Sequence, residues 1–245
     1  MLRRRVAHPR MDRAEEPMKR LVLFDIDGTL LTTHGRAVRA MMAAYRRAYG
    51  CEAAQLPYRM DGKTELQITV ELMTMAGLSR EEVLAGLPRF WRAYAEELER
   101  HVTHDTTTVH PGVAQVVQTV AADPDSVLGL LTGNCEFAAR RKLHCARLDG
   151  FVVGAYGEHH ERRDELPAVA LDGAERIAGR RFSGKEIVIL GDTPNDIDCG
   201  RALGVKAIAV ATGRFTPAEL AQHRPDAVFP TFADVPAVLR AIQAN

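Results

Sequence analysis

The stretch that decides the fold is LVLFDIDGTL, residues 21–30. Its four leading apolar residues run without interruption into Asp25, and such a short apolar run is typical of a buried strand in a parallel sheet. In open α/β sheets the ligand crevice lies outside the carboxyl ends of the strands, where we expect Asp25. A second acid, Asp27, follows two residues later, before a Gly-Thr turn. Two carboxylates this close repel each other unless a cation or a proton lies between them.

The spacing of these two acids suits phosphoryl transfer through an aspartate. One carboxylate can attack phosphorus and form an aspartyl-phosphate. A second carboxyl nearby can protonate the leaving oxygen and later activate water. Asp25-Ile-Asp27-Gly-Thr29 resembles the first motif of the haloacid dehalogenase-like (HAD) hydrolase superfamily. The resemblance implies that Asp25 is the nucleophile and that Asp27 is the acid/base.

Strand patterns alternate with helical patterns along most of the chain. The predicted strands, which are mainly apolar, are residues 127–131, 151–153, 186–190, 205–210 and 227–229. This alternation predicts βαβ units and therefore an α/β fold with a doubly wound parallel sheet, the HAD-like Rossmannoid core that the resemblance implies. Right-handed crossovers place the carboxyl ends of all these strands at one edge of the sheet.

Residues 32–105 carry helical patterns and no strand pattern, which predicts an inserted all-helical lobe. Pro88 is expected to break or kink one of its helices. The lobe resembles a C1 cap, as in phosphoglycolate phosphatases and β-phosphoglucomutase. We therefore divide the chain into a flexible basic tail (1–18), a catalytic core (19–31 and 106–245) and a helical cap (32–105).

The loop Met60-Asp-Gly-Lys63-Thr64 resembles the cap loop that faces the active site in these relatives. Lys63 is accordingly a candidate substrate-binding residue, placed to meet a carboxylate or a second phosphate. A lysine in a loop at a helix start is more often solvated, so this alternative stays open.

Polar clusters follow three of the predicted strands, and a parallel sheet would bring them together. Up to four carboxylates, with no Cys or His beside them, imply a hard, oxygen-preferring cation, and Mg²⁺ fits best. The hydroxyl of Thr132 and the amides after it can donate hydrogen bonds to phosphoryl oxygens, although Thr132 also suits a helix N-cap. The clusters are Asp25 with Asp27, Thr132-Gly133-Asn134, and Asp192 with Asp196.

The second and third clusters extend the resemblance to most of the chain, from about residue 20 onward. Leu131-Thr-Gly-Asn134 resembles the second HAD motif, which implies that Thr132, with Gly133 and Asn134, binds the phosphoryl group. GDTPND, residues 191–196, resembles the fourth motif, GDxxxD. By the same resemblance, Mg²⁺ is held by the Asp25 side chain, the Asp27 main-chain carbonyl and Asp192. Asp196 is then a further ligand or a carboxylate behind the ligands.

The third motif departs from the family pattern, which places a lysine just before the helix that precedes the fourth motif. Residues 161–167 contain no lysine. Arg163 stands at the matching helix start, and its planar fork can neutralise both the nucleophile and the phosphate. Lys185 is the rival, but it precedes the strand of the fourth motif at its amino end. Geometry therefore favours Arg163.

Composition limits the other classes of function. The chain has 245 residues and a formal net charge of zero, so there is no global electrostatic case for a nucleic-acid or anionic-membrane partner. Its apolar runs are far shorter than a membrane span. The four cysteines show no CxxC spacing and are interpreted as reduced thiols of a cytoplasmic protein. Met11 and Met18 are both possible starts.

These observations favour a Mg²⁺-dependent phosphomonoester hydrolase that acts on a small phosphorylated metabolite. Asp27 argues against a haloalkanoate dehalogenase, which uses no second aspartate as acid/base, and against a phosphonate hydrolase, which usually has a small residue there. A sugar phosphomutase keeps both acids and stays open as an alternative. A non-catalytic phosphometabolite-binding protein would be expected to lose a carboxylate, and none is lost here.

Overall fold

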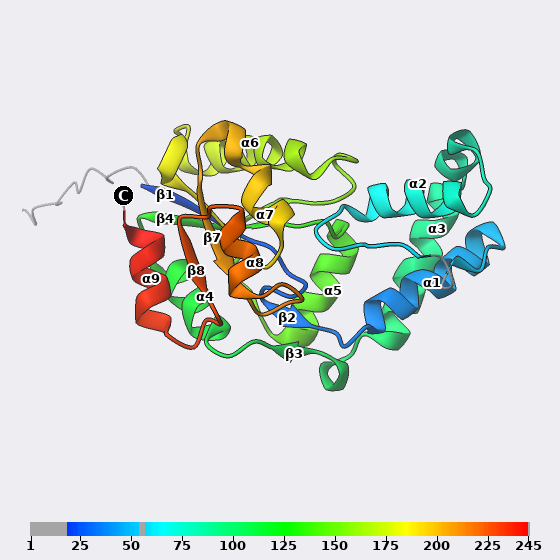
Figure 1. Cartoon of the computed structure of the whole chain (residues 1–245), viewed down its shortest axis with the longest axis horizontal. Helices are drawn as coiled ribbons and strands as arrows, with labels where there is room; N and C mark the ends of the chain where they lie inside the picture. The colour runs from blue at the N-terminus through cyan, green and yellow to red at the C-terminus, as the bar shows by residue number, and fades with distance from the viewer. Residues whose placement is uncertain (1–18, 54–56, 245) are drawn as a thin grey trace, which may run out of the picture.

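A six-stranded parallel sheet forms the centre of the computed structural model, which describes residues 19–53 and 57–244 (Figure 1). The strand order is β5-β4-β1-β6-β7-β8, so the chain winds outward from β1 in both directions. The predicted doubly wound α/β fold is confirmed. The strands are β1 (Arg20–Phe24), β4 (Ser126–Leu131), β5 (Val153–Ala155), β6 (Ile187–Gly191), β7 (Lys206–Val210) and β8 (Ala227–Phe229).

Strand β1 lies between β4 and β6, and its register aligns the ends of all three. Phe24 pairs with Leu130 of β4 and with Leu190 of β6. The apolar run of β1 is completely buried from Leu21 to Phe24, as expected for a strand covered on both faces. Because the three strands are parallel and in register, the residues that follow them meet at one edge of the sheet.

Helices cover both faces of this sheet and leave that edge open. Helices α4 (Val113–Ala122) and α9 (Val235–Gln243) pack their apolar sides on one face, and α6 (Leu166–Ala178) packs on the other (Figure 1). The remaining core helices are α5 (Glu136–Ala146), α7 (Pro194–Cys199) and α8 (Pro217–Gln222), and a 3₁₀ turn (Arg163–Glu165) leads into α6. No helix within the described ranges is long and apolar enough to cross a membrane.

A separate helical lobe follows the first strands and lies at one end of the molecule (Figure 1). It contains α1 (Arg36–Tyr49), α2 (Glu65–Met75) and α3 (Arg80–His101). Aromatic side chains hold it together: the ring centroids of Tyr45 and Phe90 are 4.6 Å apart and stacked. Two short antiparallel strands, β2 (Leu31–Thr32) and β3 (Thr108–Val109), stand where the chain enters and leaves the lobe.

Pro88 does not break α3, which runs uninterrupted from Arg80 to His101 with this proline inside it. Proline removes one hydrogen bond and crowds the carbonyl four residues earlier, here that of Leu84. Both Leu84 and Pro88 are exposed, so water can satisfy the freed carbonyl. A capping box at Ser79, whose side chain accepts from the Glu82 amide, secures the start of the helix. The predicted tail, residues 1–18, lies outside the described residues.

Candidate active site

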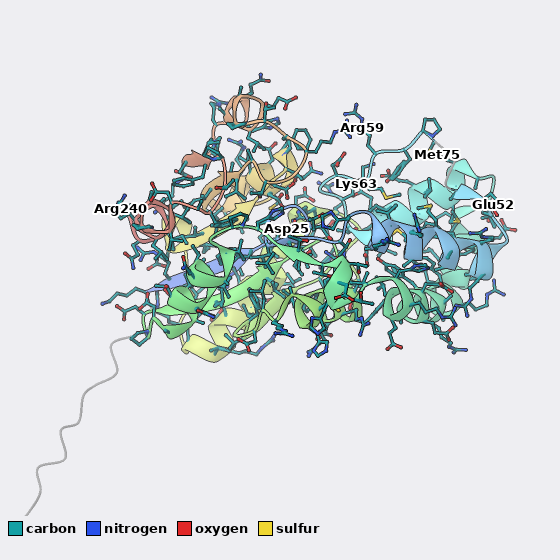
Figure 2. All side chains as sticks on the ribbon, turned by 90° about the horizontal axis from the view of Figure 1, so that it is seen from below. Asp25, Glu52, Arg59, Lys63, Met75 and Arg240 are labelled. Carbon is teal, nitrogen blue, oxygen red and sulfur yellow. The ribbon has the colours of Figure 1, made fainter. Side chains whose placement is uncertain are left out.

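Asp25 lies at the carboxyl edge of the sheet, where the core meets the helical lobe (Figure 2). Its amide donates to the Leu190 carbonyl at 3.0 Å, so its backbone continues the pairing of β1 with β6. Its side chain is buried. Burial raises the pKa of the Asp25 carboxyl to about 6, with the nearby Asp196 and Asp27 carboxylates adding to the rise and Arg163 opposing it. An extra cation beside Asp25 would therefore keep it ionised near neutral pH.

Asp25, Asp192 and Asp196 form a buried acidic cluster. One carboxylate oxygen of each lies within 4.8 Å of the others. The Thr29 hydroxyl donates to Asp192 at 2.9 Å. Burial, and then the carboxylates of Asp196 and Asp25, hold the pKa of Asp192 well above its usual range. A cluster of oxygen donors whose charges are mutually unfavourable fits a hard divalent cation, as the sequence predicts.

Asp196 is the member of the cluster with the most protein partners. One of its oxygens accepts from the Thr193 amide at 2.9 Å and from the Thr193 hydroxyl at 2.7 Å, which caps α7. Its other oxygen accepts from Arg163. Because these donors occupy both of its oxygens, Asp196 is better suited than Asp192 to a position outside the coordination shell of a bound cation.

Arg163 lies between two members of the acidic cluster, Asp25 and Asp196. Its guanidinium donates to Asp25 at 3.0 Å and to the Leu131 carbonyl at 3.2 Å, in addition to Asp196. The side chain is buried; burial opposes its charge, but the carboxylates of Asp196 and Asp25 outweigh that effect and raise its pKa. Lys185 lies before β6, at the opposite end of the strand, where it forms a 2.5 Å ion pair with Asp226. The structure therefore brings Arg163, and not Lys185, to Asp25.

A second buried cation, Lys142, contacts Asp27. The sequence analysis did not identify this residue. The Lys142 ammonium lies 2.5 Å from an Asp27 carboxylate oxygen, and the Asn134 amide donates to the same oxygen at 2.8 Å. Lys142 also donates to the Asn134 carbonyl oxygen. Burial alone would lower the pKa of Lys142, but the carboxylates of Asp27 and Glu65 outweigh it and raise that pKa.

The loop that follows β4 contains Thr132, Gly133 and Asn134, and it packs against the lobe. Gly133 has no room for a side chain, because a Cβ there would stand 2.1 Å from the Lys63 carbonyl oxygen. The Gly133 carbonyl accepts from the Glu65 amide at 2.7 Å. Thr132 is completely buried, and its hydroxyl oxygen accepts from the Asn134 side chain at 2.8 Å. Cys135, rather than Thr132, is the N-cap residue of α5.

A cavity of 290 Å³ lies between the core and the lobe, and its core side is lined by Asp25, Asp27, Asp192, Lys142 and Arg163. Gly133 and Asn134 are among the residues that line it. Its lobe side is mainly apolar, with Val38, Met41, Met60 and Ile68 facing it. A pocket with one polar end and one apolar wall is typical of a small-molecule site.

Lys63 lines the cavity, but its ammonium already has partners in the lobe. It lies 2.6 Å from Glu71 and 3.0 Å from the Tyr58 hydroxyl, and it stands over the Tyr58 ring. The Lys63 side chain is only 26% exposed. Binding to a substrate anion would require this ammonium to leave Glu71.

Glu65 is a second residue that the sequence analysis missed. It is a buried acid of the lobe, and its oxygens accept from the Tyr94 hydroxyl at 2.7 Å and from the Cys135 amide at 2.9 Å. The sequence analysis assigned no role to Glu65. For Lys142 a signal was available: Ala138, Ala139 and Cys145 share its helix face, and all are buried.

The chain is similar to several known proteins. A phosphoglycolate phosphatase 1 from Pseudomonas aeruginosa is 25% identical over 226 residues, covering 89% of this chain and 79% of the relative. A pyrophosphatase, PpaX, from Listeria welshimeri is 24% identical, covering 89% of this chain and 95% of the relative. The crystal structure of a β-phosphoglucomutase from Clostridium difficile superposes with a TM-score of 0.67 at 13% identity, covering 92% of this chain and 97% of that chain, which shows a shared fold.

A family model gives the strongest match. The model for haloacid dehalogenase-like hydrolases matches residues 19–204, from the first strand to beyond the Asp192 cluster. This range includes Asp25, Asp27 and Arg163, and also the loops that follow β4 and β6. Because the match covers most of the chain and the acids in it share one buried edge, the chain is an enzyme that belongs to the haloacid dehalogenase-like hydrolase family.

Proposed function

We propose that the enzyme is a Mg²⁺-dependent phosphomonoesterase that acts on a small phosphorylated metabolite through an aspartyl-phosphate on Asp25. One observation carries this proposal: the two acids of the DID motif each contact a different cation. Arg163 lies 3.0 Å from Asp25, and Lys142 lies 2.5 Å from Asp27. Two carboxyls in different environments can take different roles, one as nucleophile and one as acid/base.

The first half-reaction transfers the phosphoryl group to the enzyme. A carboxylate oxygen of Asp25 attacks phosphorus, and the bond between phosphorus and the ester oxygen breaks. The leaving oxygen takes the electron pair of that bond and a proton from the Asp27 carboxyl. Arg163 offsets the charge that accumulates as the carboxylate and the phosphate approach each other.

The second half-reaction returns the enzyme to its starting state. Asp27, now a carboxylate, takes a proton from a water molecule whose oxygen attacks phosphorus. The bond between phosphorus and Asp25 breaks, which regenerates the Asp25 carboxylate and releases inorganic phosphate. In this scheme the residues that would hold Mg²⁺ are Asp25, Asp192 and the main-chain carbonyl of Asp27. The ion would supply positive charge to the phosphoryl oxygens.

Several observations bear on the substrate. The P. aeruginosa relative is named for phosphoglycolate and the L. welshimeri relative for pyrophosphate, and both compounds carry a second anionic group beyond the reacting phosphate. In this chain Lys63 is the lysine that lines the lobe side of the cavity, and its ammonium is paired with Glu71. We therefore include phosphate esters with uncharged leaving groups among the candidate substrates.

The location and partners follow from simpler features. All four cysteines are free, which fits a reducing compartment, and we propose the cytoplasm. A net charge of zero gives no support for a nucleic-acid partner.

The test is a phosphatase screen of the purified protein with phosphoglycolate, pyrophosphate, sugar phosphates and alkyl phosphates. Each is assayed with Mg²⁺ and with EDTA, beside the Asp25→Asn variant. We expect inorganic phosphate to be released from at least one substrate only by the wild type with Mg²⁺. Equal activity of wild type and Asp25→Asn would refute the proposed nucleophile, and full activity in EDTA would refute the metal. Conversion of a sugar phosphate to its isomer without phosphate release would favour the phosphomutase.

A further inference from the structure

Lys142 is a buried cation that the family's four motifs do not include. It lies on α5, ten positions after Thr132, and its side chain is 3% exposed. Arg163 already supplies the positive charge beside Asp25. The second cation therefore needs its own explanation.

The other buried lysine of the described core provides a comparison. The ammonium of Lys206 donates to the backbone carbonyls of Ala241 and Ala244, at the end of α9. These contacts are structural, since they satisfy carbonyls that a helix end leaves without partners. The ammonium of Lys142 instead contacts two side chains that line the cavity, Asp27 and Asn134.

Stability alone does not explain a buried lysine at this position. Burying an ammonium costs free energy that an ion pair often fails to recover, and apolar replacements of buried pairs are frequently neutral or stabilising. The partner Asp27 is 44% exposed, so it would stay hydrated without Lys142. The contact with Asp27 therefore contributes little to folding beyond the attraction between Lys142 and the buried Glu65, and what it does provide is orientation of the Asp27 carboxyl.

We propose that Lys142 is a positioning residue that fixes the Asp27 carboxyl for proton transfer to the leaving group, an inference that rests on the proposed phosphatase activity. Lys142 and the Asn134 amide both donate to one oxygen of Asp27. The other oxygen has no such tether, so it is the one that carries the proton to the ester oxygen. Lys142 and Asn134 also stabilise the carboxylate that remains once the proton has left.

The first test measures how activity depends on the leaving group. Lys142→Met is assayed with p-nitrophenyl phosphate, whose leaving group needs no proton, and with an alkyl phosphate, whose leaving group does. We expect kcat/KM to fall about 100-fold for the alkyl phosphate, within the range for a general acid, and less than tenfold for p-nitrophenyl phosphate. Equal losses for the two substrates would overturn the proposal.

The second test is a double-mutant cycle with Asp27→Asn. If Lys142 acts through Asp27, then Lys142→Met should cost at most threefold in the Asp27→Asn background, compared with about 100-fold alone. Independent, multiplicative losses would refute the coupling. The two proposals can fail separately. If Asp25→Asn is inactive but Lys142→Met keeps the leaving-group dependence of wild type, the role of Lys142 is refuted and the phosphatase assignment stays intact.

Two controls separate this role from a loss of structure. Lys206→Met removes the matched buried lysine of the core, and we expect its leaving-group dependence to equal that of wild type. Lys142→Gln keeps a hydrogen-bond donor without the charge, so it provides a second variant if Lys142→Met does not fold. The proposal expects an intermediate leaving-group dependence for Lys142→Gln, and a dependence equal to that of wild type would count against the charged contact.

Discussion

The two walls of the cavity differ in chemistry. The core wall carries the acids Asp25, Asp27 and Asp192 with the cations Lys142 and Arg163, all at the ends of buried strands or on helices packed against them. The lobe wall carries the apolar side chains of Val38, Met41, Met60 and Ile68, together with Asp61, Glu65 and one lysine that is paired with Glu71. Under the proposed function, the core would perform the phosphoryl chemistry and the lobe would receive the leaving group. Substitutions on the two walls should therefore affect different kinetic constants.

The largest effect should come from the nucleophile. Asp25→Asn keeps the shape of the side chain but removes the attacking oxygen, so turnover should fall by at least ~10⁴-fold. The measurement is phosphate release at saturating substrate, with Asp172→Asn, an exposed residue of α6, as the matched control. Wild-type protein, but not Asp25→Asn, should also form a beryllofluoride adduct. Residual turnover within 100-fold of wild type would move the chemistry to another residue.

The next effect concerns the cation beside the nucleophile. Arg163→Ala should lower kcat/KM by about 100-fold or more, corresponding to ~2.7 kcal/mol, the usual loss for one electrostatic stabiliser of a transition state. Lys185→Ala removes a cation from the opposite end of β6 and should stay within about tenfold of wild type. Arg163→Lys should recover part of the loss, because the charge returns without the fork geometry. A severe loss in Lys185→Ala and a mild one in Arg163→Ala would reverse the assignment.

The acids of the core wall should also carry a stability cost, which is clearest for Asp25. The pKa of Asp25 is raised from 3.8 to about 6 in the folded protein, so the folded state binds an additional proton between these values. The free energy of unfolding should therefore fall as the pH rises toward and through 6, because the unfolded state releases this proton more readily.

A urea titration in EDTA measures this cost. At pH 7, Asp25→Asn should be more stable than wild type by about 3 kcal/mol, and at pH 4 the difference should shrink toward zero. Mg²⁺ should stabilise wild type more than the variant, since binding to the folded state alone favours it. If wild type were the more stable protein at pH 7 in EDTA, the acidic cluster would not be electrostatically unfavourable.

The smallest effect should arise on the lobe wall. Lys63→Met should raise KM for phosphoglycolate by up to about tenfold, or ~1.4 kcal/mol, and leave KM for an alkyl phosphate unchanged, if Lys63 leaves Glu71 to bind a second anion. Glu71→Gln should act in the opposite direction, because it releases Lys63 from its ion pair. Unchanged KM values in both variants would mean that Lys63 serves the lobe alone.

Much of the core could be predicted from the sequence, because a buried parallel strand leaves a local signal. The run of residues 21–24 predicted β1, and the acids at its end needed only the parallel topology to meet the cluster around Asp192. Strand β5 was predicted two residues early, since Val152 looks like a core residue but is 59% exposed. The short helix α8 was not predicted.

Long-range contacts left weaker signals. Lys142 follows two arginines, and a run of three basic residues is usually a solvated helix face; only its spacing from Ala138 and Ala139 shows that it faces inward. Glu65 is buried by residues of α3 and α5, which no local pattern could indicate. In α1, Val38 has helical spacing to the buried Met41 and Tyr45, but it is 45% exposed and lines the cavity. An apolar residue that faces a substrate and one that faces a core have the same pattern in sequence.

The ribbon formed by β2 and β3 has a consequence for how such enzymes diversify. Thr32 pairs with Thr108 and Leu31 with Val109, so the chain departs for the lobe and returns from it at neighbouring positions. Residues 33–107 therefore form a cassette, a segment whose two ends are held side by side by the pairing of β2 with β3. Replacing the cassette would leave the register of the central sheet in place, but it would remove Glu65, which accepts from the Cys135 amide in the loop after β4. We therefore expect a chimaera made at this ribbon to exchange the lobe as a single unit only if it keeps the contacts of Glu65.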